Sequence, residues 1–174
     1  MDGRPRDGAR EHQGDVGDNV SVGLMAYRGK DTIPDELLRM HYEEVAALQS
    51  AFRLNPDWRR YDRLNDEGKL VFIAATAQPD ALIPSGAMVG YMACIVEPHL
   101  HYKGTIVATG DVHYVLPAYR RCGLAVRMIA TAEAEAKSRG AKFFVLRSKV
   151  DHPHGDLYAD MGYKPLDTVH LKEL

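Results

Sequence analysis

Three apolar runs in the middle of the chain constrain its fold more than any other feature. Leu70–Ala77 and residues 87–96 contain no charged side chain, and a short stretch rich in turn-forming residues separates them. A third run, residues 105–115, follows a short polar loop. Connections this short cannot contain a crossover helix, so the three runs are predicted to be strands of an antiparallel meander. Because the first two runs carry no charge at any position, we expect the sheet to be covered on both faces.

The segment before these runs predicts a short strand followed by a helix. Residues 22–28 form the strand. Residues 31–36 have the features of a helix start, namely a capping residue, an early proline and acidic residues in the first turn. Apolar side chains then recur at helical spacing, which indicates one buried stripe. These side chains are Leu38, Tyr42, Val45, Leu48 and Phe52.

A second, short helix is predicted after a break at residues 55–57. Asp57 caps this helix, and Trp58, Tyr61 and Leu64 share one of its faces, with three arginines around it. Arginines beside aromatic residues leave open an acidic or nucleic-acid acceptor. A solvated face over buried aromatic residues is the favoured interpretation, and the net charge of −2 supplies no overall basic field for nucleic acid.

The best helix in the sequence follows the meander, over residues 123–139. Its apolar residues recur at helical spacing, and Gly140 is a typical first residue after a helix. Residues 142–148 then form a buried strand. A strand, a helix and a strand in this order predict parallel pairing through a right-handed crossover. A short helix over residues 153–161 and a closing strand or hairpin over residues 163–174 complete the chain.

Residues 1–21 are expected to be a flexible tail, and residues 22–174 a single domain. The tail has too few apolar groups to offset the entropy lost on ordering, and it lacks the apolar core of a signal peptide. No run of about 18 apolar residues predicts a membrane span. The two cysteines, Cys94 and Cys122, do not indicate a disulfide framework, so a cytoplasmic protein is expected.

The connection between the third strand and the long helix, residues 116–125, has the features of an anion site. A loop that leads into a helix directs several backbone N–H groups and the positive end of the helix dipole at one point. Gly123 permits close approach of an anion, and Ala125 keeps the first turn slim. Arg120 and Arg121 add positive charge suited to phosphate oxygens. The loop therefore predicts a phosphate or pyrophosphate binder, although it matches neither of the common glycine-rich phosphate loops.

Two motifs in this half of the chain identify a family resemblance. Arg120, Gly123 and Ala125 match the pattern Arg/Gln-x-x-Gly-x-Gly/Ala, and a Val-x-Pro-x-Tyr-Arg segment, residues 115–120, leads into it. Residues 157–163 match a second pattern, Leu-Tyr-x-x-x-Gly-Phe/Tyr, after the next strand. The chain thus resembles the GNAT (GCN5-related N-acetyltransferase) superfamily over about residues 22–174, and its second half is similar to short members carried by bacteriophages.

The resemblance implies an α/β (α+β) fold, with a central mixed, mostly antiparallel sheet that splays at its parallel pair and is flanked by helices. It also implies acetyl-CoA as the co-substrate. The pantetheine arm is expected to pair with the backbone of Tyr114, Val115 and Leu116 in the splay. The pyrophosphate is expected to lie in the loop. The loop residues concerned are Arg120, Arg121, Cys122, Gly123, Leu124 and Ala125.

The family mechanism is direct attack of an amine on the thioester, and three residues are candidates for its proton transfers. Tyr158 matches the general acid that protonates the CoA thiolate, and packing against the pantetheine is its alternative role. Asp111 and His113 lie two apart on a strand, so both are expected to face the same way. If that face is the acceptor side, either can act as the base, directly or through water. The alternative is that Asp111 bonds a neighbouring loop and His113 packs. Glu97 is a weaker candidate, and the Val115 N–H is expected to stabilise the oxyanion.

The acceptor follows less directly from the sequence. The resemblance implies an amine-bearing small molecule or a peptide, and it also makes a homodimer an expectation. A non-catalytic acyl-CoA-binding regulatory or interaction module is the alternative from another class of function. Many relatives have an asparagine near the position of Asp151, so contacts to the pantetheine there are in question. The eight histidines do not predict a metal site, because no set of three or four ligands has matched spacing.

Overall fold

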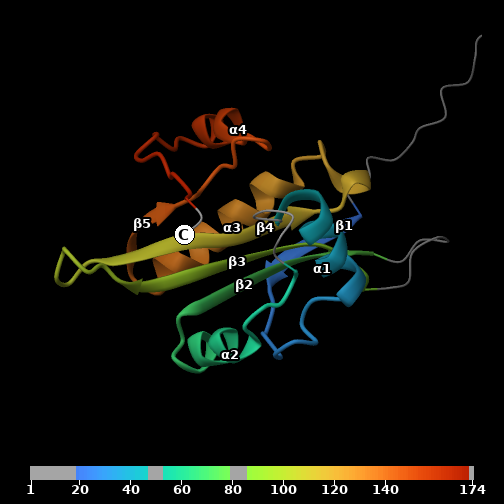
Figure 1. The fold of residues 1–174 in the computed structure, drawn as a ribbon, viewed down its shortest axis with the longest axis horizontal. Coiled ribbons are helices and arrows are strands. Elements are labelled where there is room, and N and C mark those ends of the chain that lie inside the picture. Colours follow the sequence, from blue (N-terminus) through green and yellow to red (C-terminus); the bar gives the residue numbers. More distant parts are fainter. Residues whose placement is uncertain (1–18, 47–52, 79–85, 173–174) are drawn as a thin grey trace, which may run out of the picture.

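A computed structural model of the chain describes residues 19–46, 53–78 and 86–172. In these residues a five-stranded sheet has helices on both of its faces (Figure 1). The strands lie in the order β1-β2-β3-β4-β5, so neighbours in space are also neighbours along the chain. None of the helices in this part of the chain is long and apolar enough to cross a bilayer.

The first four strands form an antiparallel meander, and the last three of them are the strands predicted from the apolar runs. They are β1 (Val20–Leu24), β2 (Leu70–Ala77), β3 (Met88–Pro98) and β4 (Ile106–Val115). The last strand, β5 (Ala141–Val145), pairs with β4 in parallel, as the strand–helix–strand order predicts.

Four α-helices accompany the sheet: α1 (Asp35–His41), α2 (Trp58–Asp66), α3 (Leu124–Ser138) and α4 (Gly155–Asp160). Helix α1 runs into a π-helical turn, η1 (Tyr42–Ala46). Two of the expected boundaries are confirmed by their caps. The Asp57 carboxylate accepts the Arg60 N–H at 3.1 Å at the start of α2, and Gly140 adopts a φ of 87° just after α3. In the apolar stripe predicted for the first helix, Leu48, Phe52 and the side chain of Val45 lie outside the described residues.

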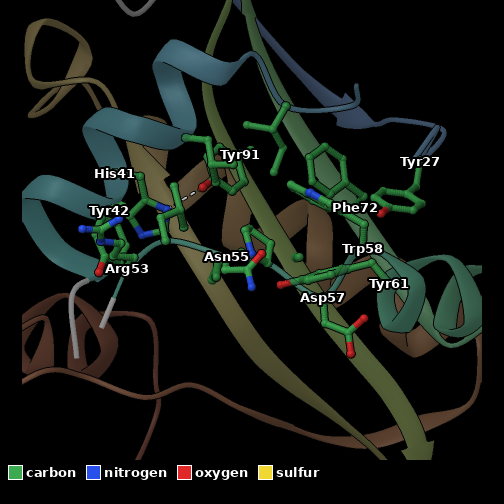
Figure 2. Close-up of a pocket in the computed structure, with 16 residues that line it drawn as sticks. Tyr27, His41, Tyr42, Arg53, Asn55, Asp57, Trp58, Tyr61, Phe72 and Tyr91 are labelled. Atoms are coloured by element: carbon green, nitrogen blue, oxygen red, sulfur yellow. Dashed lines mark hydrogen bonds between the residues drawn. The ribbon is translucent and has the colours of Figure 1, made fainter. Parts of the chain in front are cut away.

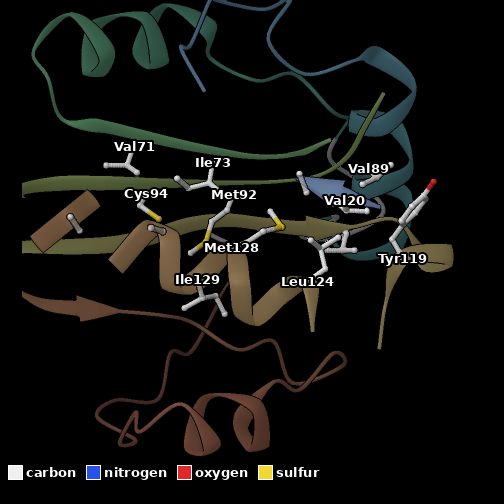
Figure 3. Packing of buried hydrophobic residues seen from close by; sticks show 14 of the residues in the cluster. Val20, Val71, Ile73, Val89, Met92, Cys94, Tyr119, Leu124, Met128 and Ile129 are labelled. Atoms are coloured by element: carbon white, nitrogen blue, oxygen red, sulfur yellow. The ribbon is translucent and has the colours of Figure 1, made fainter. Parts of the chain in front are cut away.

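Two hydrophobic clusters cover the two faces of the sheet. On one face α3 packs against the strands, and the side chains of Met128 and Ile129 are fully buried against residues such as Met92 and Ile73 (Figure 3). The other face is covered by α1 and α2 and is richer in aromatic residues. Burying each of these large side chains contributes roughly 1.5–3 kcal/mol, so the sheet is fixed from both sides.

The ends of the chain differ from the sequence-based expectation. The first strand begins at Val20, two residues before the expected start of the domain, while residues 1–18 of the predicted tail lie outside the described residues. The predicted closing strand is wrong, because residues 163–172 form no strand. Pro165 supplies no backbone N–H for a ladder. The apolar side chains of this segment also find no buried surface, as Leu166 and Val169 are 78% and 73% exposed.

Candidate functional site

The two parallel strands, β4 and β5, stop pairing about halfway along β4. Pairing between β4 and β5 runs only from Ile106 to Thr109, whereas pairing of β4 with β3 continues to Val115. Gly110 lies where the strands part, and a Cβ atom there would be 2.7 Å from Leu146 Cδ2. Glycine therefore lets the Leu146 side chain fill the base of the gap. On the side away from β3, residues 110–115 have no strand partner in the described part of the chain.

The hydrogen-bond pattern shows which N–H groups face the gap. The Leu116 N–H donates to the Val89 carbonyl at 2.9 Å. Bonded and non-bonded pairs alternate along an antiparallel ladder, so the next pair, Gly90 with Val115, is a non-bonded one. The Val115 N–H therefore points away from β3 and into the gap between β4 and β5.

A β-bulge in β4 separates the two candidate bases. Ala93 lies opposite Val112 and Cys94 opposite Gly110, so Asp111 is an extra residue without a partner on β3. An extra residue shifts the alternation of side chains between the two faces. The expectation that Asp111 and His113 face the same way is therefore wrong.

Asp111 lies on the face covered by α2. Its Oδ2 atom accepts a hydrogen bond from the Tyr61 hydroxyl at 2.6 Å. Burial raises the pKa of Tyr61 well above its usual range, and the Asp111 carboxylate raises it further. Tyr61 therefore stays protonated and holds the carboxylate at the edge of α2.

His113 lies on the opposite face, which α3 covers, because it pairs with Met92 of the cluster beneath α3. Burial lowers the pKa of His113 to about 4, and the neighbouring His154 and His41 lower it further. Its ring is therefore neutral near pH 7. The Nε2 atom is buried and has no hydrogen-bond partner in the described part of the chain.

The loop between β4 and α3 has the geometry of an anion site. After a short 3-10 turn, η2 (Pro117–Tyr119), Arg121 and Gly123 adopt φ values of 67° and 72°. Nothing lies within 4 Å of a Cβ atom built on Gly123, so the approach to the helix is open. Helix α3 then begins at Leu124, which is buried, and its first N–H groups have no partner within the helix. Arg121, Cys122 and the half-buried Ala125 also belong to this loop and to the first turn of the helix.

Arg120 differs from the other loop residues, because its guanidinium is held by neighbouring groups. The Nε atom donates to the Val115 carbonyl at 2.8 Å. The two terminal nitrogens donate to both oxygens of Glu44, at 2.5 and 2.8 Å. The Tyr114 hydroxyl also donates to Glu44, at 2.9 Å. Arg120 therefore ties the loop to η1, while Arg121, also exposed, lies nearer to the start of α3 in the chain.

Tyr158 lies on α4, half-buried beside two other rings. Its ring centroid is 6.0 Å from that of His154 and 5.8 Å from that of Tyr163. The hydroxyl makes one long hydrogen bond, 3.3 Å, to the Arg147 carbonyl. Burial raises the pKa of Tyr158 above its usual value, so the hydroxyl carries its proton at neutral pH.

A pocket of about 360 Å³ opens on the face covered by α1 and α2 (Figure 2). Figure 2 shows aromatic side chains from several parts of the chain around it. Tyr27 follows β1, Trp58 and Tyr61 come from α2, Phe72 from β2 and Tyr91 from β3. Val112 of β4 also lines the pocket, next to Asp111 in the chain. The pocket thus reaches the bulge where the parallel strands separate.

Two residues of this region were not identified from the sequence. His41 is buried and lines the pocket, and Glu44 binds Arg120. The His41 ring stacks on Tyr114 at 4.8 Å, and its Nδ1 atom lies 2.5 Å from the Tyr91 hydroxyl. Burial lowers the pKa of His41 to about 4, and Lys149 lowers it further. Helical periodicity places His41 one turn after the buried Leu37, but periodicity does not identify its partners on the sheet.

Other candidates lie away from this region. Glu97 pairs with Val107, six residues along β3 from Tyr91, which is about 20 Å along an extended strand. Asp151 is exposed in the loop before α4. His99 and His101 lie together on the turn between β3 and β4, with ring centroids 5.7 Å apart. Over the described ranges no group of three or more metal-ligating side chains comes together.

Comparison with known proteins gives one family. The family model for acetyltransferases of the GNAT family matches residues 36–163. No curated protein matches the sequence.

Many solved structures share the fold. An acetyltransferase from Trypanosoma brucei has a TM-score of 0.61 at 18% identity, over 89% of this chain and 99% of its own. An aminoglycoside acetyltransferase from an uncultured soil metagenomic sample, solved in complex with sisomicin, has a TM-score of 0.66 at 13% identity, over 91% and 98%. A glucosamine-6-phosphate N-acetyltransferase from Arabidopsis thaliana has a TM-score of 0.60 at 14% identity, over 88% and 97%. At these identities the likeness establishes the fold and not the acceptor.

Proposed function

The chain belongs to the GNAT family of acetyltransferases, and we propose on that basis that it transfers the acetyl group of acetyl-CoA directly to an amine acceptor. The observation that carries the proposal is the separation of β4 from β5 after Thr109, next to the open N-terminus of α3. An extended thioester donor needs both features, since one receives its amide-containing arm and the other its pyrophosphate.

Acetyl-CoA is proposed to lie with its pantetheine arm along the free edge of β4. The backbone of Tyr114, Val115 and Leu116 borders this part of the gap. The pyrophosphate then meets the N–H groups of the first turn of α3, with Gly123 leaving room for its oxygens and Arg121 supplying charge. Support for this arrangement comes from the open space at Gly123 and from the direction of the Val115 N–H.

The reaction forms one C–N bond and breaks one C–S bond. An unprotonated amine attacks the thioester carbonyl, and the oxyanion accepts a hydrogen bond from the Val115 N–H. The C–S bond then breaks, and we assign Tyr158 as the group that gives its proton to the CoA thiolate. The nitrogen must also lose a proton. We assign this step to Asp111, directly or through water, because Asp111 lies on the face that holds the aromatic pocket, whereas His113 lies on the other face.

The test is release of free CoA thiol from acetyl-CoA in the presence of a panel of amines. Gly123→Glu should abolish release, because it places a negative charge and a strained side chain at the anion site. Gly104→Glu is the matched control. Gly104 also has a positive φ, 82°, and open space around it, but it lies on the turn between β3 and β4. Thiol release that survives Gly123→Glu would contradict the proposed donor site.

A further inference from the structure

The aromatic pocket has a chemistry that restricts its occupant. We propose that it binds the acceptor, and that the acceptor is an amine carried on an apolar, ring-containing body rather than a polycationic sugar. This inference rests on the proposed transfer to an amine and specifies the class of molecule that the site takes. It is carried by the lining of the pocket, its size and the position of Asp111 at its edge.

The wall of the pocket is a continuous series of rings. The centroid of Trp58 is 5.9 Å from that of Tyr61, which is 6.1 Å from Tyr27. Tyr27 is 6.4 Å from Phe72, and Phe72 is 6.1 Å from Tyr91. These distances are those of interacting aromatic pairs, so a further ring placed against this wall finds both faces and edges to contact.

Most of the pocket lining is uncharged near pH 7, and among the described lining residues Arg53 and Asp57 carry the formal charges. Phe72, Tyr91 and Ala93 are buried there, and the neighbouring His41 ring is neutral because burial lowers its pKa to about 4. Among the described residues that line the pocket, Asp57 is the only carboxylate, and it already caps α2. A polycationic sugar amine needs several carboxylates to replace its hydration, and this lining does not supply them.

The volume also limits the occupant. An apolar cavity of about 150 Å³ holds benzene, and this pocket has about 360 Å³. One or two rings with a short amine-bearing arm therefore fill it. The amine would leave the rings on the side of Tyr61 and Val112, where the Asp111 carboxylate lies. A charged amine gains there from the carboxylate and from the face of the Tyr61 ring.

The single tryptophan of the chain makes occupancy directly measurable. Trp58 lines the pocket, so its fluorescence under selective excitation reports binding whether or not transfer occurs. We would titrate 2-phenylethylamine, glucosamine and kanamycin into the protein saturated with CoA, which cannot donate an acetyl group. We expect 2-phenylethylamine to produce a saturable change in Trp58 fluorescence. Its Kd should be at least tenfold lower than the Kd of either sugar amine.

Tyr27→Ser removes one ring from the wall and should weaken binding of 2-phenylethylamine about fivefold, the loss typical of one ring contact. Tyr102→Ser is the control, because Tyr102 is 65% exposed on the turn between β3 and β4. Equal affinities of Tyr27→Ser and the wild type would count against the ring wall. The ligand comparison on wild-type protein does not depend on the folding of either variant.

Two assays together separate this inference from the proposed function. If 2-phenylethylamine changes the fluorescence but no amine releases thiol from acetyl-CoA, the pocket inference stands and the proposed transfer fails. If kanamycin or glucosamine is acetylated and 2-phenylethylamine neither binds nor reacts, the transfer stands and the pocket inference is overturned. Absence of any saturable change with 2-phenylethylamine overturns it as well.

Discussion

At the scale of single residues, the two faces of β4 divide the chemistry between them. The bulge directs Asp111 toward Tyr61 and the aromatic pocket, while His113 remains on the face beneath α3. Tyr158 approaches from α4, beyond the parallel pair. The proposed acid and the proposed base thus come from different elements, as suits a reaction in which one proton leaves the amine and another joins the sulfur.

Tyr158→Phe removes the proposed acid while keeping the ring. The rate of thiol release at saturating acetyl-CoA should fall about 100-fold, the lower range for loss of a general acid, with little change in KM for acetyl-CoA. If Tyr158 only packs against the donor, the phenylalanine variant should keep nearly the wild-type rate. Steady-state kinetics on the two proteins distinguishes these outcomes.

His41 predicts a loss of stability in acid. Its folded-state pKa, about 4, lies below the usual value of about 6.5 for an unfolded chain, so the unfolded chain binds the proton first. The contribution, about 3 kcal/mol, is fully present above pH 6.5 and is lost as the pH falls from 6.5 to 4. Urea unfolding between pH 6.5 and 4 should show the fall in the free energy of unfolding. In the His41→Gln variant the free energy of unfolding should depend less steeply on pH.

His113 should also make the protein less stable as the pH falls, because burial lowers its pKa to about 4 as well. The His41→Gln variant should therefore retain part of the pH dependence. His101→Gln, a substitution at an exposed position on the turn between β3 and β4, serves as the control. If the free energy of unfolding of His41→Gln falls with pH as steeply as that of the wild type, His41 does not contribute to the pH dependence.

At the scale of elements, a polar contact joins the donor loop to the helical layer. Glu44 of η1 receives both terminal nitrogens of Arg120 and the hydroxyl of Tyr114. The Arg120 side chain also bonds the carbonyl of Val115, at the end of β4. One carboxylate thus connects η1, β4 and the loop that precedes α3, which are the segments on either side of the proposed reaction centre.

Glu44→Gln should loosen this loop without removing any proposed catalytic group. The pair is about one-third exposed, so its loss is worth about 1 kcal/mol and should raise KM for acetyl-CoA roughly fivefold at low salt. Added salt should reduce the difference in KM between Glu44→Gln and the wild type, because salt screens the ion pair. Glu36→Gln breaks a comparable pair with Arg39 on the exposed side of α1 and should leave KM unchanged. An unchanged KM for Glu44→Gln would mean that the pair does not position the loop.

The elements also show how far the sequence predicts this fold. Absence of charge predicted β2 and β3, and the caps at Asp57 and Gly140 predicted α2 and α3, because both signals are local. The bulge at Asp111 was missed because it depends on the register against β3, to which no local pattern in β4 corresponds. The partners of His41 are likewise set by packing across about 50 residues of chain. The predicted closing strand does not form, and the apolar residues of that segment stay exposed.

For the whole molecule, the proposed donor site between β4 and β5 predicts that folding and donor binding are interdependent. The sheet has an internal break in its ladder after Thr109, and residues on both sides of that break, such as Val115 and Leu146, pack in or against the core beneath α3. A ligand that pairs with the free edge of β4 and the end of α3 binds the folded chain and not the unfolded one. Acetyl-CoA should therefore stabilise the entire domain by mass action.

At a concentration 100 times its Kd, acetyl-CoA should add about 2.7 kcal/mol to the free energy of unfolding. For a chain of this length this corresponds to a rise in Tm of roughly 5–10 °C, measurable by differential scanning fluorimetry. Gly123→Glu should abolish the rise, and Gly104→Glu, which has the same added charge and a similar backbone conformation, should keep it. Because this measurement needs no acceptor, it tests the donor site even when the amine is unknown. An equal rise in both variants would mean that acetyl-CoA binds elsewhere than at the N-terminus of α3.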